Sequence, residues 1–182
     1  MNAMPLAIAD VLLLEPRVFE DTRGAFFESF NARTFAELIG RDLRFVQDNQ
    51  SVSRRGVVRG LHYQVAPAPQ GKLVRVLAGA IFDVAVDIRR SSPTFGQHVG
   101  EILSAENRRQ LWIPEGFAHG FAALRDGTEV LYKTTDFYHR AAERAIRWDD
   151  PDLAIAWPTD FTPILSDKDA EAPHFRGATL FD

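Results

Sequence analysis

The sequence predicts an all-β protein with one domain and short helices at its margins. Runs of β-favouring residues are broken by Gly, Pro, Asp or Asn about every eight to twelve residues. No solenoid-length repeat or low-complexity linker divides the 182 residues, which are enough for one substantial core. This spacing favours an antiparallel sandwich or barrel over alternating strands and helices.

The clearest strand is expected over residues 80–88, AIFDVAVDI. One of its faces is apolar, and the other carries Asp83 and Asp87. Residues 72–79 and 130–138 predict two further strands.

Two short helical segments are expected outside the strands. Asn31 can cap a helix in ARTFAELIG that ends at Gly40. A second helical turn is predicted in SDKDAEAP, residues 166–173. Neither segment is long enough to change the all-β assignment.

Composition and charge narrow the function classes. Apolar residues make up 46% and charged residues 25%, as in ordinary soluble proteins, and the net charge of −4 does not indicate a nucleic-acid partner. The sequence has no cysteine, which excludes disulfides, thiolate nucleophiles and cysteine-ligated zinc. The first apolar run, in MNAMPLAIADVLLLEP, is too short to span a bilayer and lacks the cationic flank of a signal peptide. We therefore expect a cytoplasmic protein without membrane contact.

Two of the five histidines lie in runs predicted as strands, namely His62 in RGLHYQ and His119 in WIPEGFAHGFAAL. His98, His139 and His174 lie beside polar or turn residues and are expected at the surface. On composition alone, His62 is either a satisfied core residue or an acid–base group, since its ordinary pKa lies near neutrality.

The stretch PEGFAHGF, residues 114–121, resembles the second conserved motif of the cupins, which are double-stranded β-helix barrels. Metal-binding cupins provide a His-x-His pair and a glutamate in their first motif, whereas the nearest stretch here is His62-Tyr63-Gln64. Two isolated histidines fall short of the three or more ligands that a tightly held divalent metal needs. We therefore expect no metal.

Polar residues embedded in or beside apolar stretches favour a functional site over simple packing. They are Arg59, Lys72, Tyr132, Tyr138 and Asp169. Lys72 is predicted on the same side of its strand as Val74 and Val76, which is unusual for a solvating lysine. One face of the later strand is expected to carry Tyr132, Thr134, Asp136 and Tyr138. Aromatic packing remains the alternative for both tyrosines.

Seven motifs, spread in order over nearly the whole chain, together resemble the dTDP-4-dehydrorhamnose 3,5-epimerase family. They are FEDTRGAFFESF, VQDNQS, RGVVRGLHYQ, QGKLVRVLAGAIFDVAVDIR, IPEGFAHGF, LYKTTDFY and SDKD. The resemblance implies one cupin-type double-stranded β-helix (jelly-roll) domain over residues 1–182 with small peripheral helices. It also implies a homodimer that uses no metal or cofactor and inverts carbons 3 and 5 of a dTDP-linked 4-keto-6-deoxy sugar.

The resemblance assigns a role to each of four catalytic residues. His62 is the base, Asp169 orients it, Lys72 stabilises the enolate, and Tyr132 returns a proton from the other side. Arg23, Arg59 and Lys168 suit the diphosphate. The other positions expected to contact the nucleotide-sugar are Glu28, Gln47, Asp48, Asn49, Lys72, His119 and Glu143. Phe19, Phe26 and Tyr138 are candidates to stack on thymine, with a core role as the alternative for the phenylalanines.

Three local questions remain open in the sequence. Gln50 stands where many family members have histidine, and it either tunes the site or faces solvent. Strict alternation puts Arg59 and His62 on opposite faces, so we predict a bulge at Gly60 that turns both inward. Asp83 competes with Asp169 as the partner of His62.

Three alternative functions also remain. The first is a mono-epimerase of another deoxysugar pathway, because small shifts of the sugar decide whether a second proton is removed. The second is a cupin that binds a sugar nucleotide without turning it over. The third, a metal-dependent cupin, is weakened by the missing ligands.

Overall fold

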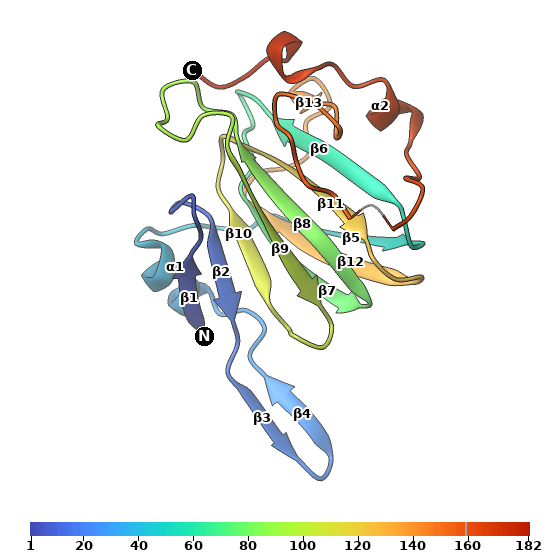
Figure 1. Cartoon of the computed structure of the whole chain (residues 1–182). Coiled ribbons are helices and arrows are strands. Elements are labelled where there is room, and N and C mark those ends of the chain that lie inside the picture. The colour runs from blue at the N-terminus through green and yellow to red at the C-terminus, as the bar shows by residue number, and fades with distance from the viewer. Residues whose placement is uncertain (159) are drawn as a thin grey trace.

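Two antiparallel sheets face one another and form the body of the protein (Figure 1). The structure is a computed structural model that describes residues 1–158 and 160–182. In spatial order, the six-stranded sheet contains β1 (Asn2–Pro5), β2 (Leu12–Glu15), β10 (Gln110–Ile113), β7 (Lys72–Ala78), β12 (Thr128–Thr134) and β5 (Gln47–Ser53). The five-stranded sheet contains β13 (Glu143–Ala145), β6 (Val58–Gln64), β11 (Phe117–Ala123), β8 (Ala80–Asp87) and β9 (His98–Ser104). The predicted all-β fold is confirmed.

Apolar side chains pack on both faces of each sheet. The core between the sheets includes Val74, Val76, Ile81, Leu111, Phe121 and Val130. The outer face of the five-stranded sheet packs against the C-terminal segment through residues such as Val84, Val86, Trp157 and Phe175. Because strand side chains alternate, β8 contributes to both layers, and its inward face also buries Asp83.

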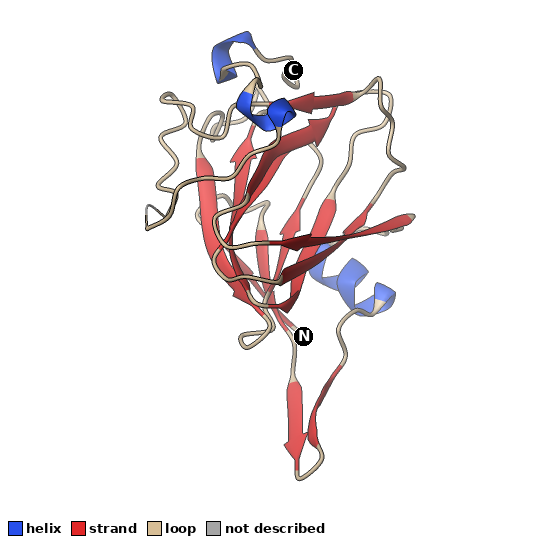
Figure 2. Cartoon of the chain, turned by 90° about the vertical axis from the view of Figure 1, so that its right-hand side faces the viewer, coloured by secondary structure: helices blue, strands red, loops and turns tan. Residues whose placement is uncertain are grey.

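Short helices lie at the margins of the strands, as predicted (Figure 2). Helix α1 (Ala32–Ile39) is capped by Asn31 and ends at Gly40, whose φ of 71° is left-handed. It covers the outer face of the six-stranded sheet, where Phe35 packs against Trp112. Near the C-terminus are α2 (Asp167–Ala170) and the 3₁₀ turn η1 (Phe175–Gly177). None of the helices in the described part of the chain is long and apolar enough to cross a membrane.

The strand predicted over 130–138 is shorter than expected. β12 ends at Thr134, which pairs with Gln47, the first residue of β5, and with Lys72, the first residue of β7. Beyond Thr134 both neighbouring strands have ended, so the chain leaves the sheet. The prediction that Asp136 and Tyr138 share the strand face of Tyr132 is therefore wrong.

The predicted bulge at Gly60 is present in β6. His119 pairs with His62 and Phe121 pairs with Arg59, so three steps on β6 match two on β11. Gly60 has a φ of 125°, and a Cβ there would lie 2.5 Å from the Cα of Gly120. Only glycine allows this close approach, and the extra residue turns both Arg59 and His62 toward the interior.

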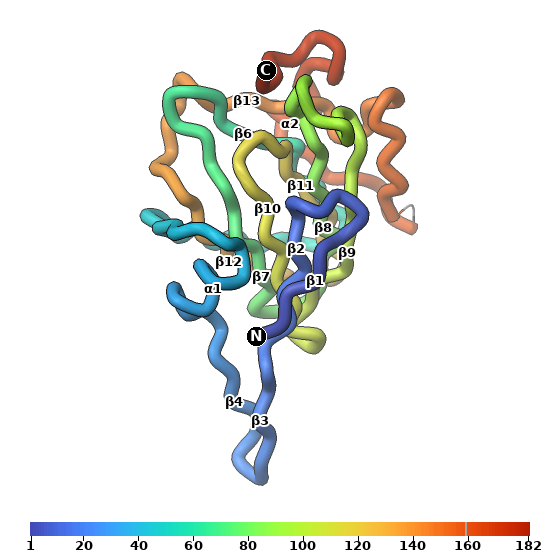
Figure 3. The backbone as a smooth tube through the Cα atoms, turned by 90° about the vertical axis from the view of Figure 1, so that its left-hand side faces the viewer, coloured from blue at the N-terminus to red at the C-terminus, as the bar shows by residue number. Residues whose placement is uncertain are grey.

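Strands β3 (Val18–Asp21) and β4 (Gly24–Phe27) form a hairpin that extends away from the two sheets (Figure 3). Its aromatic residues are not part of the core, since Phe19 is 52% and Phe26 71% exposed. The alternative core role for these phenylalanines is therefore wrong for the single chain.

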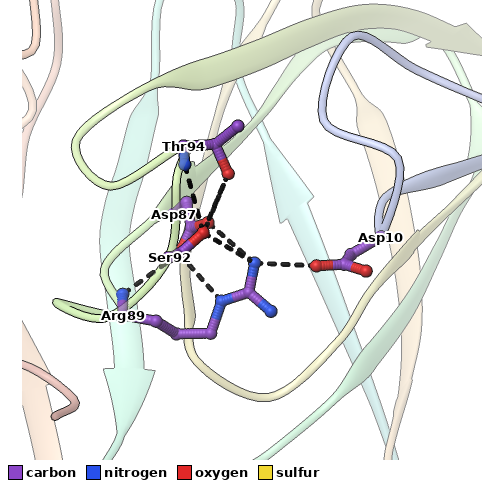
Figure 4. A network of polar contacts seen from close by, with 5 residues as sticks. All are labelled: Asp10, Asp87, Arg89, Ser92 and Thr94. Atoms are coloured by element: carbon purple, nitrogen blue, oxygen red, sulfur yellow. Dashed lines mark hydrogen bonds and ion pairs between the residues drawn. The ribbon is translucent and has the colours of Figure 1, made fainter.

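A buried carboxylate at the end of β8 ties the N-terminal turn to the barrel (Figure 4). Asp87 accepts hydrogen bonds from Arg89 Nε at 2.9 Å, Ser92 Oγ at 2.6 Å and Thr94 Oγ1 at 2.7 Å. Arg89 also pairs with Asp10 at 2.7 Å. Burial raises the pKa of Asp87, but these hydrogen bonds outweigh it and lower the pKa to about 2.

Candidate active site

A cavity of about 320 Å³ opens between the two sheets. The six-stranded sheet lines it with Gln47, Asn49, Ser51, Lys72 and Tyr132. The five-stranded sheet lines it with Arg59, His62, Gln64, His119, Phe121 and Glu143. Side chains that follow or flank these strands complete it, among them Tyr138, Ser166 and Asp169. The four predicted catalytic residues therefore meet in one cavity.

Asp169, and not Asp83, is the partner of His62. His62 Nε2 lies 2.5 Å from Asp169 Oδ1. Ser166 Oγ donates to the second oxygen, Oδ2, at 2.9 Å and also accepts from the backbone N–H of Asp169 as the cap of α2. Burial raises the pKa of Asp169, but the hydrogen bonds from His62 and Ser166 and the charge of His62 outweigh this effect and lower the pKa below its ordinary value, so Asp169 is held ionised.

Lys72 reaches across the cavity from the six-stranded sheet. Its Nζ donates to the backbone carbonyl of His62 at 3.0 Å, and the residue is only 7% exposed. Burial lowers the pKa of Lys72 to about 8, against the opposing attraction of Asp83 and Glu143. The site thus holds a desolvated ammonium that loses its proton more easily than a surface lysine.

Tyr132 projects into the cavity from β12, on the sheet that faces His62. Burial raises the pKa of its phenol, and the nearby charge of Glu143 raises it too, while Arg59 lowers it. The phenol consequently keeps its proton at neutral pH. A proton donor and an imidazole therefore enter one cavity from opposing sheets.

The second imidazole of the cavity also has its own carboxylate. His119 lies directly opposite His62 in the strand register, and its Nε2 is 2.6 Å from Asp83 Oδ1. Burial lowers the pKa of His119, against the opposing effect of Asp83. Across residues 1–158 and 160–182, no three His, Asp or Glu side chains form a group that could hold a metal ion.

The remaining histidines are mostly superficial, as expected. His139 and His174 are exposed. His98 is half-buried instead, and burial lowers its pKa.

Asp48, one of the predicted substrate-binding residues, does not line the cavity. Gln47, Asn49 and Ser51 alternate into the cavity along β5, which turns Asp48 and Gln50 to the other face. Asp48 pairs there with Lys133 at 3.0 Å, and Gln50 donates to Glu129 at 3.1 Å. Gln50 therefore does not line the cavity of its own chain. Strict strand alternation along β5 would have predicted that Asp48 and Gln50 point away from the cavity.

Three predicted binding residues meet at the mouth of the cavity. Tyr138 donates its hydroxyl to Glu143 at 3.1 Å, and Glu143 pairs with Lys168 at 2.5 Å. Burial raises the pKa of Glu143, but the hydrogen bond and charge of Lys168 lower it below its ordinary value. Lys168 itself does not line the cavity.

Arg23 and Glu28 do not belong to the cavity of this chain. Arg23 lies at the tip of the β3–β4 hairpin, where it pairs with Asp21 at 2.6 Å. Glu28 follows β4 and accepts from Asn31 at 3.0 Å. Neither residue lines the cavity of its own chain, and their contact with substrate stays a prediction.

Several cavity residues were not predicted. Gln64 lies two residues after His62 on the inward face of β6, and Ser51 continues the alternation of Gln47 and Asn49. Both follow from periodicity alone. Ser166 precedes Asp169 by three residues as a helix cap, which is a recognisable local signal.

Comparisons with known proteins agree with this geometry. The family model described as dTDP-4-dehydrorhamnose 3,5-epimerase matches residues 5–177. The chain belongs to this family. It is 60% identical over 181 residues to the dTDP-4-dehydrorhamnose 3,5-epimerase of Pseudomonas aeruginosa, covering 100% of this chain and 99% of that protein.

Two further family members bear on the choice between double and single epimerisation. The crystal structure of dTDP-6-deoxy-D-glucose-3,5-epimerase from Legionella pneumophila, in complex with dTDP-4-keto-L-rhamnose, matches with a TM-score of 0.94 at 53% identity, over 97% of this chain and 93% of that one. The dTDP-4-dehydrorhamnose 3-epimerase of Streptomyces niveus is 44% identical over 172 residues, which cover 94% of this chain and 83% of that protein. The cupin-type fold and the epimerase family are thus established for this chain.

Proposed function

We propose that the protein inverts carbons 3 and 5 of dTDP-4-dehydro-6-deoxy-D-glucose to give dTDP-4-dehydro-L-rhamnose, a step of dTDP-L-rhamnose biosynthesis. One observation carries the proposal: a carboxylate-bound imidazole and a protonated phenol enter one cavity from opposing sheets, beside a buried ammonium. Family membership supports the reaction, and the bound product of the Legionella pneumophila relative supports the substrate class.

His62 is the proposed base. Protons beside a ketone are weakly acidic because the carbanion delocalises onto the ketone oxygen as an enolate. Since Nε2 is engaged by Asp169, Nδ1 is the nitrogen that takes the proton from carbon 3 or carbon 5. The ionised Asp169 orients the ring and stabilises the imidazolium that forms.

Lys72 and Tyr132 are proposed to complete the inversion. With a pKa of about 8, Lys72 is mostly protonated at neutral pH, and its buried ammonium can donate to the enolate oxygen. Tyr132 keeps its proton through burial and lies on the sheet opposite His62. Protonation from that side, after deprotonation by His62, reverses the configuration of the carbon.

The proposed substrate contacts divide between the interior and the mouth of the cavity. Gln47, Asn49 and His119 line the interior and suit the sugar. Arg59 and Lys168 offer positive charge for the diphosphate, and Tyr138 at the mouth offers a ring for thymine. Glu143, between Tyr138 and Lys168, orients both.

We further propose a homodimer in which the β3–β4 hairpin of one protomer supplies Arg23 and Glu28 to the site of its partner. A lone two-stranded hairpin with exposed Phe19 and Phe26 is marginally stable in water, which supports a docked state. Arg23→Ala and His62→Ala should each inactivate a homodimer. A mixed dimer of the two variants contains one intact site of its two. Because random subunit exchange makes about half of the dimers mixed, activity should return to about a quarter of the wild-type value. No recovery after verified subunit exchange would overturn hairpin sharing.

The reaction itself is tested by proton NMR of dTDP-4-keto-6-deoxyglucose with the enzyme in heavy water. Deuterium at carbons 3 and 5, abolished by His62→Ala, is the expected result. Tyr132→Phe should retain exchange but lose inverted product. Label at one carbon would identify a mono-epimerase like the Streptomyces niveus relative, and no label with retained binding would identify a non-catalytic binding protein.

We also propose that catalysis needs no metal or cofactor and takes place in the cytoplasm. The cysteine-free sequence is compatible with that compartment. Full activity after dialysis against EDTA is expected. Activity that falls with chelation and returns with a divalent metal would contradict the metal-free proposal, and cell fractionation tests the compartment.

A further inference from the structure

Asp83 is a buried carboxylate that the proposed chemistry does not use. It lies on the inward face of β8 and is 0% exposed. Its Oδ1 contacts His119 Nε2 at 2.6 Å, whereas its Oδ2 is buried without a hydrogen-bond partner among the described residues. Burial of an unpartnered carboxylate oxygen opposes folding, so packing alone does not explain this residue.

The Asp83 contact determines which nitrogen of His119 carries a proton. An ionised carboxylate only accepts hydrogen bonds, so Nε2 is the donor. A neutral imidazole has a single N–H, which leaves Nδ1 unprotonated. His119 also lines the cavity, next to His62 on the neighbouring strand.

The surroundings of His119 favour its neutral form. Burial lowers its pKa, and the charges of Lys72 and His62 lower it as well, while Asp83 alone opposes them. Burial lowers the pKa of Lys72 in turn. The charges of Asp83 and Glu143 raise this pKa, and the charge of Lys168 lowers it. A positive charge on His119 would be opposed by the charge of the buried Lys72, with which it shares Asp83.

We propose that Asp83 is a positioning residue that fixes His119 as the neutral Nε2–H tautomer, so that Nδ1 accepts a hydrogen bond from a hydroxyl of the sugar. The identity of the sugar rests on the proposed function, but the tautomer does not. Although His62 and His119 each hold a carboxylate through Nε2, their tasks differ: His62 removes a carbon-bound proton, and His119 orients the ring. As an acceptor, His119 cannot stabilise the enolate oxygen, and that task falls to Lys72.

The tautomer is tested by NMR of the full-length protein labelled with ¹⁵N-histidine, with His119 assigned through His119→Gln. At pH 7 and above we expect a protonated Nε2 and an unprotonated Nδ1. An Nδ1–H tautomer or an imidazolium at pH 7 in the wild-type protein would overturn the proposal, even if no variant of Asp83 folds. Asp83→Asn should raise the population of the Nδ1–H tautomer. The matched control Asp169→Asn should change the signals of His62 and leave those of His119.

A double-mutant cycle tests whether Asp83 acts through His119. With dTDP-4-keto-6-deoxyglucose, Asp83→Asn should raise KM about tenfold and change kcat less, because a ground-state hydrogen bond is lost. In the His119→Gln background, the same substitution should change KM less than twofold. An undiminished effect there would show that Asp83 acts on Lys72 or on the fold and would refute the proposal. A wild-type enzyme inactive on this sugar would refute the proposed function. The tautomer of His119 would still be tested by NMR, which needs no substrate.

Discussion

Replacement of Lys72 by methionine should make the protein more stable and inactive. The ammonium of Lys72 is desolvated between the sheets, and its pKa of about 8 lies below the ordinary value of 10.5. Folding must therefore bury a charge that water solvates better. Methionine has a similar length without the charge, and it can pack against the apolar core beside Val74.

The size of the effect follows from the pKa difference. A shift from 10.5 to about 8 corresponds to about 3 kcal/mol of lost stability at pH 7. The lost hydrogen bond to the carbonyl of His62 offsets about 1 kcal/mol, so Lys72→Met should gain about 2 kcal/mol. Between pH 8 and 10.5 the unfolded chain binds more protons than the folded one, so wild-type stability rises with pH. At pH 9.5 the penalty falls to about 1 kcal/mol and the advantage of the variant vanishes.

Urea unfolding at pH 7.0 and 9.5, at one fixed protein concentration, measures this difference. Lys133→Met is the matched control, because Lys133 lies on the outward face of β12 and pairs with Asp48. Its stability difference from wild type should stay constant between the two pH values. A Lys72→Met protein that is less stable than wild type at pH 7.0, or whose difference from wild type does not depend on pH, would refute the reasoning.

Three other substitutions test the support of the site and the fold. Ser166→Ala should lower kcat about tenfold by removing the hydroxyl that fixes Asp169, and Ser166→Thr should restore it; equal rates for wild type and Ser166→Ala would exclude this role. Gly60→Ala should destabilise the protein by more than about 2 kcal/mol in urea unfolding, because its Cβ would meet the opposing strand at 2.5 Å. Gly24→Ala is the control, because Gly24 has a similar φ of 127° but no atom near the position of a Cβ. A similar loss of stability in Gly24→Ala would mean that φ alone, and not the contact with the opposing strand, explains the effect at Gly60. Asp87→Asn should cost about 2 kcal/mol at pH 7, and this difference should disappear as acid protonates Asp87 in wild type between pH 4 and pH 2; a difference that persists at pH 2 would refute the ionic explanation.

Local patterns predicted those elements that depend on neighbours in the chain. The alternation in residues 80–88, the cap at Asn31 and the stop at Gly40 are all short-range signals. The end of β12 is not such a signal. It depends on where β5 and β7 begin, and those strands lie far away in the sequence.

The site shows the same division. His62, Lys72 and Tyr132 were predicted from strand runs and a family resemblance, and all three line the cavity. Asp48 was predicted by resemblance against its own strand alternation, and the alternation is what the structure follows. Arg23 was assigned to the site, but it lies between β3 and β4 and does not line the cavity of its own chain.

The sequence by itself determined the all-β class and the bulge at Gly60, because periodicity and glycine chemistry act within a few residues. The set of catalytic side chains came from the family resemblance. Only the tertiary structure decided which carboxylate serves which histidine. Asp83 and Asp169 were both eligible for His62, and their separation along the chain says nothing about distance in space. The packing of α2 against β6 brings Asp169 to His62, while the register of β8 and β11 gives Asp83 to His119.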